Sequence, residues 1–342
     1  MAQGTQDMAA CARENLQEKV LLTGGLGMLG SHVSRALVAS GRRPVIYDAG
    51  TDTTLIADVA SRCDIVQGSL DDLPRIMNAI KDHKPTAILH FAAQVGAAVD
   101  KFPWTALHAN LVGTTAMFEC ARLMGVERVV FPSSKMVYGH VAQRHQHPRY
   151  EPVPEEHPLQ PLILYAKLKR AAEDMAAHYA QMYGLDIVAF RFGSSFGPGK
   201  TGRSKAIPLM GLIESAIARQ PFHMECGAEQ FDDYCYSGEA ANAAVAALDA
   251  PLQRGKFRAY NIASGELISL GQIVALLKEL YPGWNGSAGP GLDYRKIGPG
   301  YYFKMDSGKA QQEIGFRPRF NFRSAVLDYA ALLELQKVQG ST

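Results

Sequence analysis

The sequence predicts an α/β protein with a doubly wound parallel sheet and a smaller C-terminal lobe interleaved with it. Apolar runs of strand length alternate with helical apolar spacing up to about residue 200, and this alternation is typical of a parallel sheet covered by helices on both faces. A glycine-rich turn follows the first apolar run, and polar residues follow several others. Because such sheets bind ligands beyond the carboxyl ends of their strands, we expect a site at that edge.

The bulk composition favours a small-molecule partner. The 342 residues suffice for one large α/β unit or two domains with a buried core. A formal charge of +2, from 35 basic and 33 acidic residues, gives no electrostatic reason to expect nucleic acid or an anionic membrane as a partner. No apolar run approaches the roughly 20 residues that span a bilayer, and no secretory pattern opens the chain. Five scattered cysteines without C-x-x-C spacing suit reduced thiols, so we expect a cytoplasmic protein.

The first strand–turn–helix unit has the pattern of a dinucleotide-binding turn. Residues 20–23 form the expected strand and residues 31–40 the expected helix. In the turn between them, Gly24 and Gly27 let the backbone approach a pyrophosphate, while Gly30 permits close helix packing. The free N–H groups at the start of the helix favour an anion. The alternative is a plain tight turn, which the position between a strand and a helix disfavours.

The second strand ends in an acidic residue that favours NAD over NADP. Residues 44–47 form this strand, and Asp48 follows Gly30 by 18 residues. A carboxylate there accepts hydrogen bonds from the adenosine ribose hydroxyls and repels a 2′-phosphate. Arg42 and Arg43 argue for NADP, although their position before the strand suits a solvated loop. We predict NAD and keep NADP as the alternative.

The later strands bring small and polar residues to the same edge of the sheet. In HFAAQVG (90–96), Ala92 and Ala93 either let the backbone pass close to the cofactor or simply pack. Ser134 follows the next apolar run. The expected strands are 64–67, 86–91, 126–131 and 185–192, and the expected helices are 104–124 and 164–183.

Residues 140–161 form a proline-rich stretch with four histidines. Their spacing is irregular and no rigid frame presents them, so we expect no metal site. We expect a surface loop that overhangs the active site. The histidines are His140, His145, His147 and His157.

Beyond residue 200 the alternation of strands and helices becomes sparser. We therefore expect an N-terminal extension (1–18), a mainly NAD-binding Rossmann domain (19–199), and a mainly substrate-binding lobe (200–342) with some elements that return to the sheet. In the last part we expect a short strand or turn at 231–236, a strand at 260–263, and helices at 208–219, 239–248, 269–280 (with Ser269 as its N-cap) and 325–337.

Tyr165 and Lys169 are the predicted centre of the chemistry. Four residues apart on a helix, they share one face and can act on one bound molecule. A tyrosine with its usual pKa of about 10 is protonated at neutral pH and is therefore a poor base, but a neighbouring ammonium favours the tyrosinate. Ser134 would hold the substrate oxygen and share its proton.

Each of these residues also has an ordinary structural interpretation. Tyr165 suits an amphipathic helix, Lys169 a solvated surface and Ser134 a turn. Their joint occurrence after a glycine turn and an acid-ended strand favours catalysis instead. A secondary alcohol oxidised by NAD loses a hydride from carbon and a proton from oxygen, and the proton needs a base. The sequence therefore predicts hydride transfer at a secondary alcohol.

Six motifs along the chain carry a resemblance to a known family: TGGLGMLG (23–30), HFAAQVG (90–96), FPSSKMVYG (131–139), YAKLK (165–169), RFGSSFGPG (191–199) and YNIASGE (260–266). Together they resemble the extended short-chain dehydrogenase/reductase family, in its NAD-dependent epimerase/dehydratase group typified by sugar-nucleotide epimerases, over about residues 19–329. The resemblance implies catalytic roles for Ser134, Tyr165 and Lys169. The predicted cofactor-binding residues are Gly24, Gly27, Met28, Leu29, Gly30, Asp48, Ser69, Leu70, Phe91, Ala92, Ala93, Gln94 and Asn110, together with Tyr165 and Lys169.

Departures from the family pattern concern mostly the substrate. Lys135-Met136 follow Ser134 where family dehydratases carry Asp-Glu, so we do not expect dehydration. Ser194 and Asp232 stand where family members often carry an Asn and an Arg beside a substrate diphosphate, and an acid there weakens diphosphate binding. The candidate substrate residues are Lys135, Met136, Ser194, Asp232 and, as compensating cations, Arg203, Lys205 and Lys304; Ser69 replaces a usual acid near the adenine.

The sequence leaves three functions open. The first is an NAD-dependent, C4-epimerase-like enzyme of a sugar or sugar nucleotide. The second is a net dehydrogenase or reductase of a non-nucleotide sugar, sugar acid or other secondary alcohol. The third is a non-catalytic NAD-sensing scaffold, whose usual mark is a lost Tyr or Lys, and both are present here. By resemblance, helices 104–124 and 164–183 pair in a homodimer, although their apolar faces suit burial against the sheet equally well.

Overall fold

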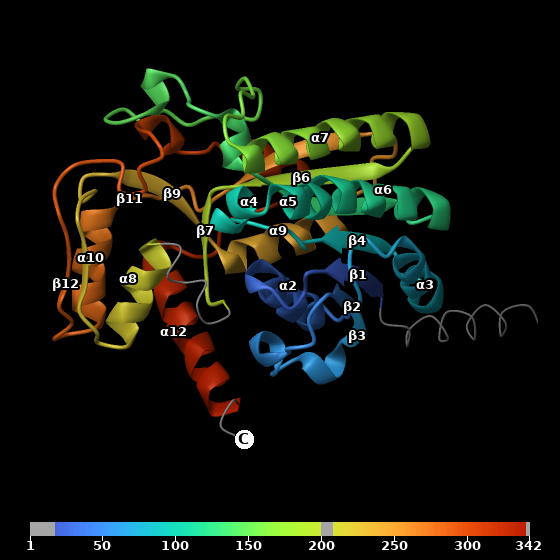
Figure 1. The fold of residues 1–342 in the computed structure, drawn as a ribbon, viewed down its shortest axis with the longest axis horizontal. Helices are drawn as coiled ribbons and strands as arrows, with labels where there is room; N and C mark the ends of the chain where they lie inside the picture. The colour runs from blue at the N-terminus through green and yellow to red at the C-terminus, as the bar shows by residue number, and fades with distance from the viewer. Residues whose placement is uncertain (1–17, 200–207, 340–342) are drawn as a thin grey trace, which may run out of the picture.

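A seven-stranded parallel sheet forms the centre of the molecule (Figure 1). The computed structural model describes residues 18–199 and 208–339. The strand order is β10-β6-β5-β4-β1-β2-β3, and all neighbouring strands are parallel. The predicted doubly wound sheet is confirmed. Its strands are β1 (Lys19–Thr23), β2 (Arg43–Asp48), β3 (Asp64–Gln67), β4 (Ala87–His90), β5 (Arg128–Ser134), β6 (Asp186–Phe192) and β10 (Phe257–Ile262).

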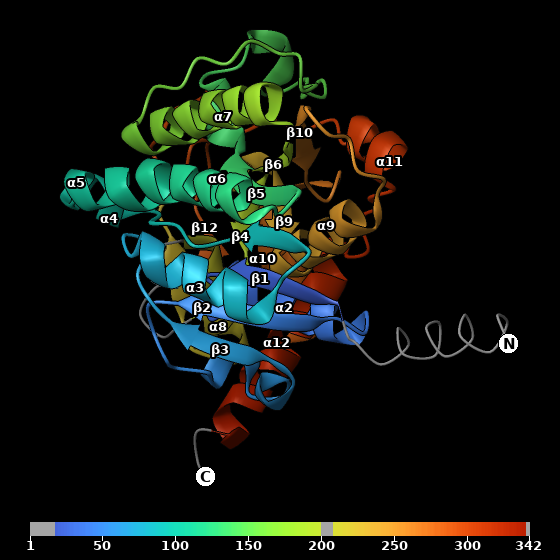
Figure 2. The ribbon, with the colours of Figure 1, turned by 90° about the vertical axis from the view of Figure 1, so that its right-hand side faces the viewer.

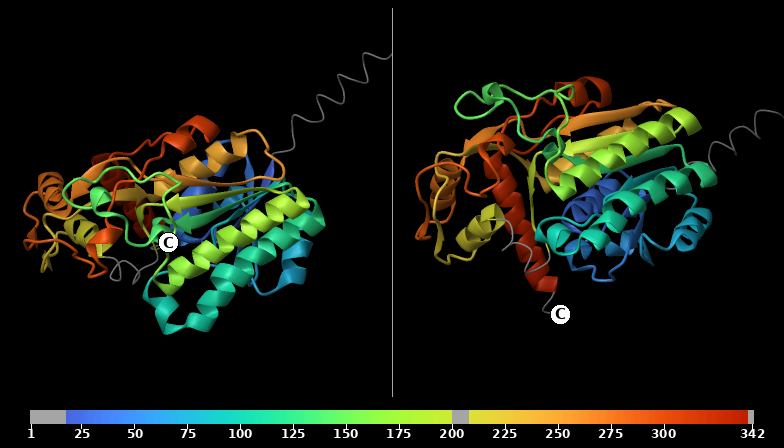
Figure 3. Two further views of the ribbon diagram at one scale, coloured as in Figure 1. Left: turned by 90° about the horizontal axis from the view of Figure 1, so that it is seen from above. Right: turned by 45° about the horizontal axis from the view of Figure 1, so that its top comes forward.

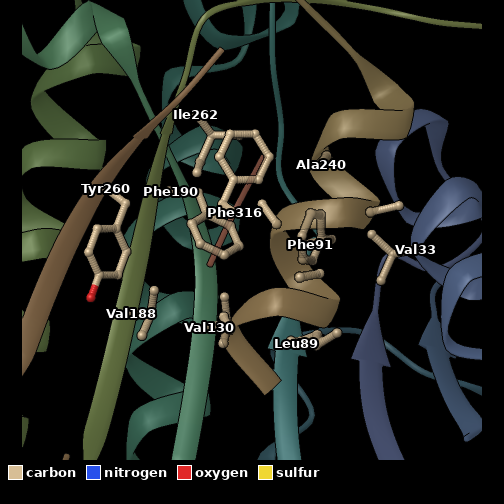
Figure 4. Packing of buried hydrophobic residues seen from close by; sticks show 14 of the residues in the cluster. Val33, Leu89, Phe91, Val130, Val188, Phe190, Ala240, Tyr260, Ile262 and Phe316 are labelled. Carbon is tan, nitrogen blue, oxygen red and sulfur yellow. The ribbon is translucent and has the colours of Figure 1, made fainter. Parts of the chain in front are cut away.

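Helices cover both faces of this sheet, as Figure 2 shows. On one face, Val33 of α2 and Ala240 of α9 belong to the same apolar cluster as Phe190 of the sheet (Figure 4). The small side chains of alanine-rich α9 are buried in this layer. On the other face, Phe118 and Ala176 belong to a second apolar cluster. The first face carries α2 (Met28–Ala39), α9 (Ser237–Asp249) and α11 (Gly308–Ile314), and the second carries α3 (Leu73–His83), α6 (Gly113–Met124) and α7 (Leu164–Tyr183).

A second lobe lies beyond the carboxyl end of β6, on the left of Figure 1 and of both views in Figure 3. It has its own apolar core, which includes Leu212, Leu277 and Val326. One of its sheets has the order β11-β9-β7, and the other pairs β12 with β8. We define the second lobe as β7 (Ser194–Phe196), α8 (Pro208–Ile217), β8 (Phe222–Met224), β9 (Phe231–Tyr236), β11 (Leu267–Ser269), α10 (Leu270–Leu280), β12 (Gly286–Ala288) and α12 (Phe322–Gln339).

Several predicted elements are confirmed at or near their expected bounds. The helix over 164–183 and the strands over 64–67 and 231–236 have the predicted limits. Ser269 caps α10 in a capping box, in which its side chain accepts from Gln272 N and the Gln272 side chain accepts from Ser269 N.

The predicted helix over 104–124 is confirmed as one unbroken helical run, but it contains a π-helical turn that the sequence did not reveal. The structure has α5 (Pro103–Leu107), a π-helical turn (His108–Val112) and then α6. The widened turn surrounds Asn110, whose side chain bonds both backbone groups of Gln94. β5 is also longer than predicted, because its pairing with β6 continues to Ser134. Elements that the sequence did not reveal include α3, α11, α4 (Ala97–Lys101) and the short strands β7, β8, β11 and β12.

The prediction of a surface loop for the histidine-rich stretch is wrong in part, because some of its side chains are buried. His145 is buried and its ring nitrogen lies 2.7 Å from the carbonyl oxygen of Glu151. Val153 is also buried, in an apolar cluster with Tyr138 and Phe303, and this cluster draws the stretch inward. Within the described ranges, no three His, Cys, Asp or Glu side chains are grouped to hold a metal ion. In the same ranges, no helix has the length and apolar character needed to cross a membrane.

Candidate active site

The glycine turn after β1 is shaped by close backbone approaches. Gly24 has a φ of +69°, and a Cβ there would lie 2.5 Å from the backbone nitrogen of Ala92. A Cβ on Gly30 would overlap the carbonyl oxygen of Gly24. The turn therefore needs glycine at both positions. Glycine at position 24 lets the turn pack against the loop after β4, where Ala92 and Ala93 lie partly buried.

The start of α2 is open for an anion. Its N-cap is Gly27, and among the described residues no side chain caps the helix. The first turn, which contains Met28 and Leu29, carries no acidic residue. The first N–H groups of a helix have no partner within the helix, and they attract negative charge. The glycine cradle and this uncapped end fit the pyrophosphate of a dinucleotide.

Asp48 is placed beside the same turn. Its Oδ2 accepts from Leu26 N at 3.2 Å, and its Oδ1 accepts from Gly50 N at 3.0 Å. Carboxylate oxygens have further acceptor capacity, so Asp48 can also accept from ribose hydroxyls.

The two arginines that favoured NADP in the sequence are paired with carboxylates of the protein. Arg42 bonds Glu18 and Asp249, and Arg43 bonds Asp64. Arg43 also belongs to β2 itself, which corrects its predicted position before the strand. Neither cation is free for a 2′-phosphate.

Other predicted cofactor residues line the ends of β3 and β4. Ser69 is exposed, and its carbonyl accepts from the Tyr47 hydroxyl. Leu70 packs beside Gly113 at the start of α6. Phe91 is buried in the core. Asn110 fixes the backbone of Gln94, whose buried side-chain Oε1 has no hydrogen-bond partner among the described residues.

The structure brings Ser134, Tyr165 and Lys169 together at the carboxyl end of β5. Burial raises the pKa of Tyr165 to about 12, and its hydrogen bond with Ser134 opposes this shift. Burial lowers the pKa of Lys169 to about 8, while the Glu173 carboxylate opposes that shift. Lys169 Nζ donates to the carbonyl of Pro132 at 2.7 Å and lies 5.9 Å from the centroid of the Tyr165 ring. The Tyr165 phenol thus has both a hydroxyl partner and a cation beside it.

Glu173 is a supporting residue that the sequence analysis missed. It follows Lys169 by one helical turn on α7, which was the available signal. Its Oε1 accepts from Ser133 Oγ at 2.5 Å, and its carboxylate pairs with Arg191 at 2.7 Å. Arg191 also donates to the Tyr138 hydroxyl. This buried group holds the side chains of Ser133 and Tyr138, which lie on either side of Ser134 in the chain.

A buried ionic cluster lies on the side of the second lobe. Lys135 Nζ lies 2.5 Å from Asp232 Oδ1, and Ser194 Oγ donates to Asp232 Oδ2 at 2.5 Å. Lys135 is 2% exposed and Asp232 is fully buried. Burial raises the pKa of the neighbouring Asp233 to about 7. Lys135, Ser194 and Asp232 are predicted as separate substrate residues, but in the structure Asp232 bonds both of the others.

The remaining candidate substrate residues are less closely joined to this cluster. Met136 and Lys304 are partly buried. Arg203 and Lys205 lie outside the described residues. Arg295, which the sequence analysis missed, carries a positive charge that adds to the effect of burial in lowering the pKa of Lys135. The hydroxyls of Tyr234 and Tyr294 lie 3.1 Å apart in the same region.

The fold and the site together define a class of protein. A glycine cradle at an open helix end, an acid after β2 and a Ser–Tyr–Lys group at the same edge of a parallel sheet form the site of a nicotinamide-dependent oxidoreductase. The family model for the NAD dependent epimerase/dehydratase family matches residues 20–263, and the chain belongs to this family. It is therefore an NAD-dependent enzyme of the extended short-chain dehydrogenase/reductase type, as the motifs predicted.

Known proteins similar to this chain agree with that assignment. A UDP-glucose 4-epimerase of Rhizobium leguminosarum bv. trifolii is 27% identical over 328 residues, which cover 90% of this chain and 95% of that protein. A dTDP-glucose 4,6-dehydratase of Xanthomonas campestris pv. campestris (strain B100) is 26% identical, with 90% of each chain covered. The crystal structure of the Thermus thermophilus UDP-glucose 4-epimerase in complex with NAD has a TM-score of 0.76 and 26% identity, and covers 92% of this chain and 99% of that one.

Proposed function

We propose that the protein transfers a hydride at a secondary alcohol carbon of a sugar or sugar nucleotide, in the manner of a 4-epimerase. The observation that carries this proposal is the group of Ser134, Tyr165 and Lys169 at the sheet edge that also bears the glycine turn. The names of the relatives support a sugar nucleotide as the first substrate class to test.

Each residue of this group has a separate role. NAD, when bound, supplies the hydride acceptor. Tyr165, in its tyrosinate form, takes the proton of the substrate hydroxyl to become the neutral phenol and gives that proton back when the carbonyl is reduced, and Ser134 holds the substrate oxygen by a hydrogen bond. Burial favours the neutral phenol of Tyr165. With a pKa of about 8, Lys169 is mostly protonated at neutral pH, and its ammonium favours the tyrosinate that accepts the hydroxyl proton.

A second candidate function is the net oxidation of a non-nucleotide sugar, sugar acid or other secondary alcohol. The bonded pair of Lys135 and Asp232 favours it, because the two charges offset each other and Lys135 is not available as a cation for a diphosphate. Titration calorimetry with UDP- and dTDP-sugars separates the two. Little heat with all of them supports the second function, whereas micromolar binding supports the nucleotide sugar.

The test of the chemistry is turnover of a substrate panel. Nucleotide sugars, free sugars and sugar acids are incubated with NAD, reduced nicotinamide is followed by absorbance, and epimers are followed by NMR. Tyr165→Phe should lower turnover by about 10²–10⁴-fold and leave NAD affinity nearly unchanged. Tyr183→Phe, at the other end of the same helix, is the matched control. If Tyr165→Phe turned over substrate as fast as the wild type, Tyr165 would not be the base and the proposed mechanism would fail. If no alcohol reacted, the proposed function would fail and an NAD-sensing scaffold would replace it.

We also propose a cytoplasmic homodimer. Large exposed apolar side chains lie on the neighbouring helices α5, α6 and α7: Trp104 is 72% exposed, Met182 is 61% exposed and Leu123 is 47% exposed. Pairing with a second copy would cover such residues. Four described cysteines are free thiols, which suits a reducing compartment. Light scattering on the purified protein gives the test, and a monomer at micromolar concentration would contradict the dimer.

A further inference from the structure

We infer that Lys135 and Asp232 are positioning residues for the proposed reaction: their buried ion pair holds the turn that carries Ser134 against the second lobe and thereby fixes the Ser134 hydroxyl relative to Tyr165. The inference rests on the proposed function, because it assigns the pair a part in the proton transfer. Neither side chain is assigned contact with the substrate.

The first step is the short connection between Lys135 and Ser134. Ser134 ends β5, and Lys135 begins a 3₁₀ turn over Lys135–Tyr138. Ser134 Oγ accepts from Met136 N at 3.2 Å, so the hydroxyl belongs to this turn. A shift of the Lys135 side chain is therefore transmitted to Ser134 through one peptide bond.

The second step is the number of partners around Asp232. Its Oδ1 accepts from Lys135 Nζ and from Asp233 N at 3.0 Å, and its Oδ2 accepts from Ser194 Oγ. Both oxygens are thus used, which fixes the orientation of the carboxylate. Lys135 Nζ also lies 5.0 Å from the centroid of the Phe303 ring, which limits its movement on another side.

The third step is the topology. β5 belongs to the seven-stranded sheet and β9, which carries Asp232, belongs to the three-stranded sheet, so no strand pairing joins them. The ion pair makes a direct link between the two, and Ser194 adds the start of β7, which follows β6. The position of the second lobe and the position of the Ser134 turn are therefore coupled through one carboxylate.

The fourth step is energetic. Removing two charges from water offsets most of their attraction, so a buried pair adds little net stability compared with an apolar pair of similar size. Position, by contrast, is critical in catalysis, because a misplacement of about 1 Å can lower a rate by about 100-fold. A pair that is nearly neutral for stability yet fixed beside the reacting hydroxyl suits a positioning role.

The decisive variant replaces both charges at once. Lys135→Met with Asp232→Leu leaves no unpaired buried charge, so we expect a folded protein with NAD affinity close to that of the wild type. We expect kcat to fall by about 10–100-fold while KM changes by less than about threefold, because the hydroxyl is displaced but binding groups remain. Lys135→Arg keeps the ion pair and should restore kcat to well above that of the double variant. Both are assayed with the alcohol that the wild type turns over fastest.

Two further variants keep the test decisive. Asp232→Asn keeps the size of the residue and one acceptor oxygen, but it removes the negative charge and replaces the other oxygen with an amide nitrogen. It serves if the double variant does not fold, and a lower kcat is expected again. Arg128→Met alters another buried ion pair, at the opposite end of the same strand β5. It should lower stability and leave kcat unchanged.

The outcomes distinguish this inference from the proposed function. An active wild type together with a folded double variant of unchanged kcat would overturn the positioning role alone. The same holds if KM rises while kcat stays constant, because the pair would then bind substrate. A wild type that turns over no alcohol would overturn the proposed function and this inference with it.

Discussion

The cofactor side and the substrate side of the site are built in different ways. The cofactor side depends on backbone shape, since Gly24 and Gly30 allow the turn after β1 to pack against itself and against Ala92. The substrate side depends on buried charges from distant segments, with Lys135 and Asp232 joined across two sheets. A short motif can encode the first arrangement, whereas the second exists only after the chain has folded.

This difference bears on how the chain encodes cofactor binding and substrate binding. Backbone contact with a dinucleotide restricts the residues of one turn, and this chain has glycine at the two positions where a Cβ would clash. The substrate side is made of bonded side chains. An acid at position 232 pairs with the lysine at position 135, so replacing either residue changes the hydrogen bonds of the whole cluster. Chemistry and substrate are therefore separable properties of this fold.

The largest expected effect is on the substrate side. Lys135→Met leaves Asp232 buried without its cation, and breaking a buried pair in this way costs about 3–5 kcal/mol of folding free energy. The free energy of unfolding, measured with urea, should fall by that amount. Lys296→Met removes an exposed lysine whose Nζ lies 3.8 Å from Glu225 Oε2, and it should change the same quantity by less than about 1 kcal/mol. Equal effects of the two substitutions would contradict the buried pairing.

The residues proposed for the cofactor side can be found in the sequence because their pattern is local. The turn from Gly24 to Gly30, Asp48 after β2 and the helical spacing of Tyr165 and Lys169 can each be recognised within a few residues. The limits of α7 followed from its apolar period and from Gly184, which stops it.

The missing features depend on contacts that no local pattern contains. The link from Lys135 to Asp232 spans 97 residues, and nothing near either residue identifies its partner. The π-helical turn at Asn110 arises from bonds to Gln94 in another loop. The short strands β7, β8, β11 and β12 have three residues each, too few to show a period of two.

The next prediction concerns Lys169, which lies where the two sides meet. Burial depresses the pKa of Lys169 in the folded protein from 10.5 to about 8, so between these values the unfolded chain binds more protons. Stability should therefore rise with pH across this window by up to about 3 kcal/mol, and the penalty of the buried charge should be complete below pH 8. Lys169→Met should lack this component of the rise, whereas Lys167→Met, an exposed lysine on the same helix, should keep it. If the stability of all three proteins changed with pH in the same way, burial of the Lys169 ammonium would not be destabilising and the prediction would be wrong.

A backbone substitution tests the cofactor side. Gly24→Ala places a methyl group 2.5 Å from Ala92 N at a φ of +69°, so the turn must move. We expect NAD affinity to fall by about 100-fold, which is about 2.8 kcal/mol at 1.4 kcal/mol per factor of ten. Gly41→Ala is matched in φ, at +79°, but meets nothing within 4 Å, so it should cost only about 1–2 kcal/mol of stability and leave NAD affinity intact. Fluorescence titration measures the NAD affinity of both variants. Similar losses of affinity in the two would contradict the argument from backbone fit.

The smallest effect should come from a side chain on the cofactor side. Asp48→Ala removes the carboxylate that accepts from Leu26 N and Gly50 N and that faces the expected ribose position. We expect NAD affinity to fall by about tenfold, or about 1.4 kcal/mol. The loss for NADP should be smaller, because the same change also removes repulsion of a 2′-phosphate, and Arg42 and Arg43 remain paired with their own carboxylates. The gap between the two cofactors should therefore narrow without reversing. Asp58→Ala, which breaks only a surface pair with Arg35, should change neither affinity. An Asp48→Ala enzyme with the wild-type preference would show that backbone shape alone selects the cofactor, and the contrast between the two sides would then be sharper than proposed.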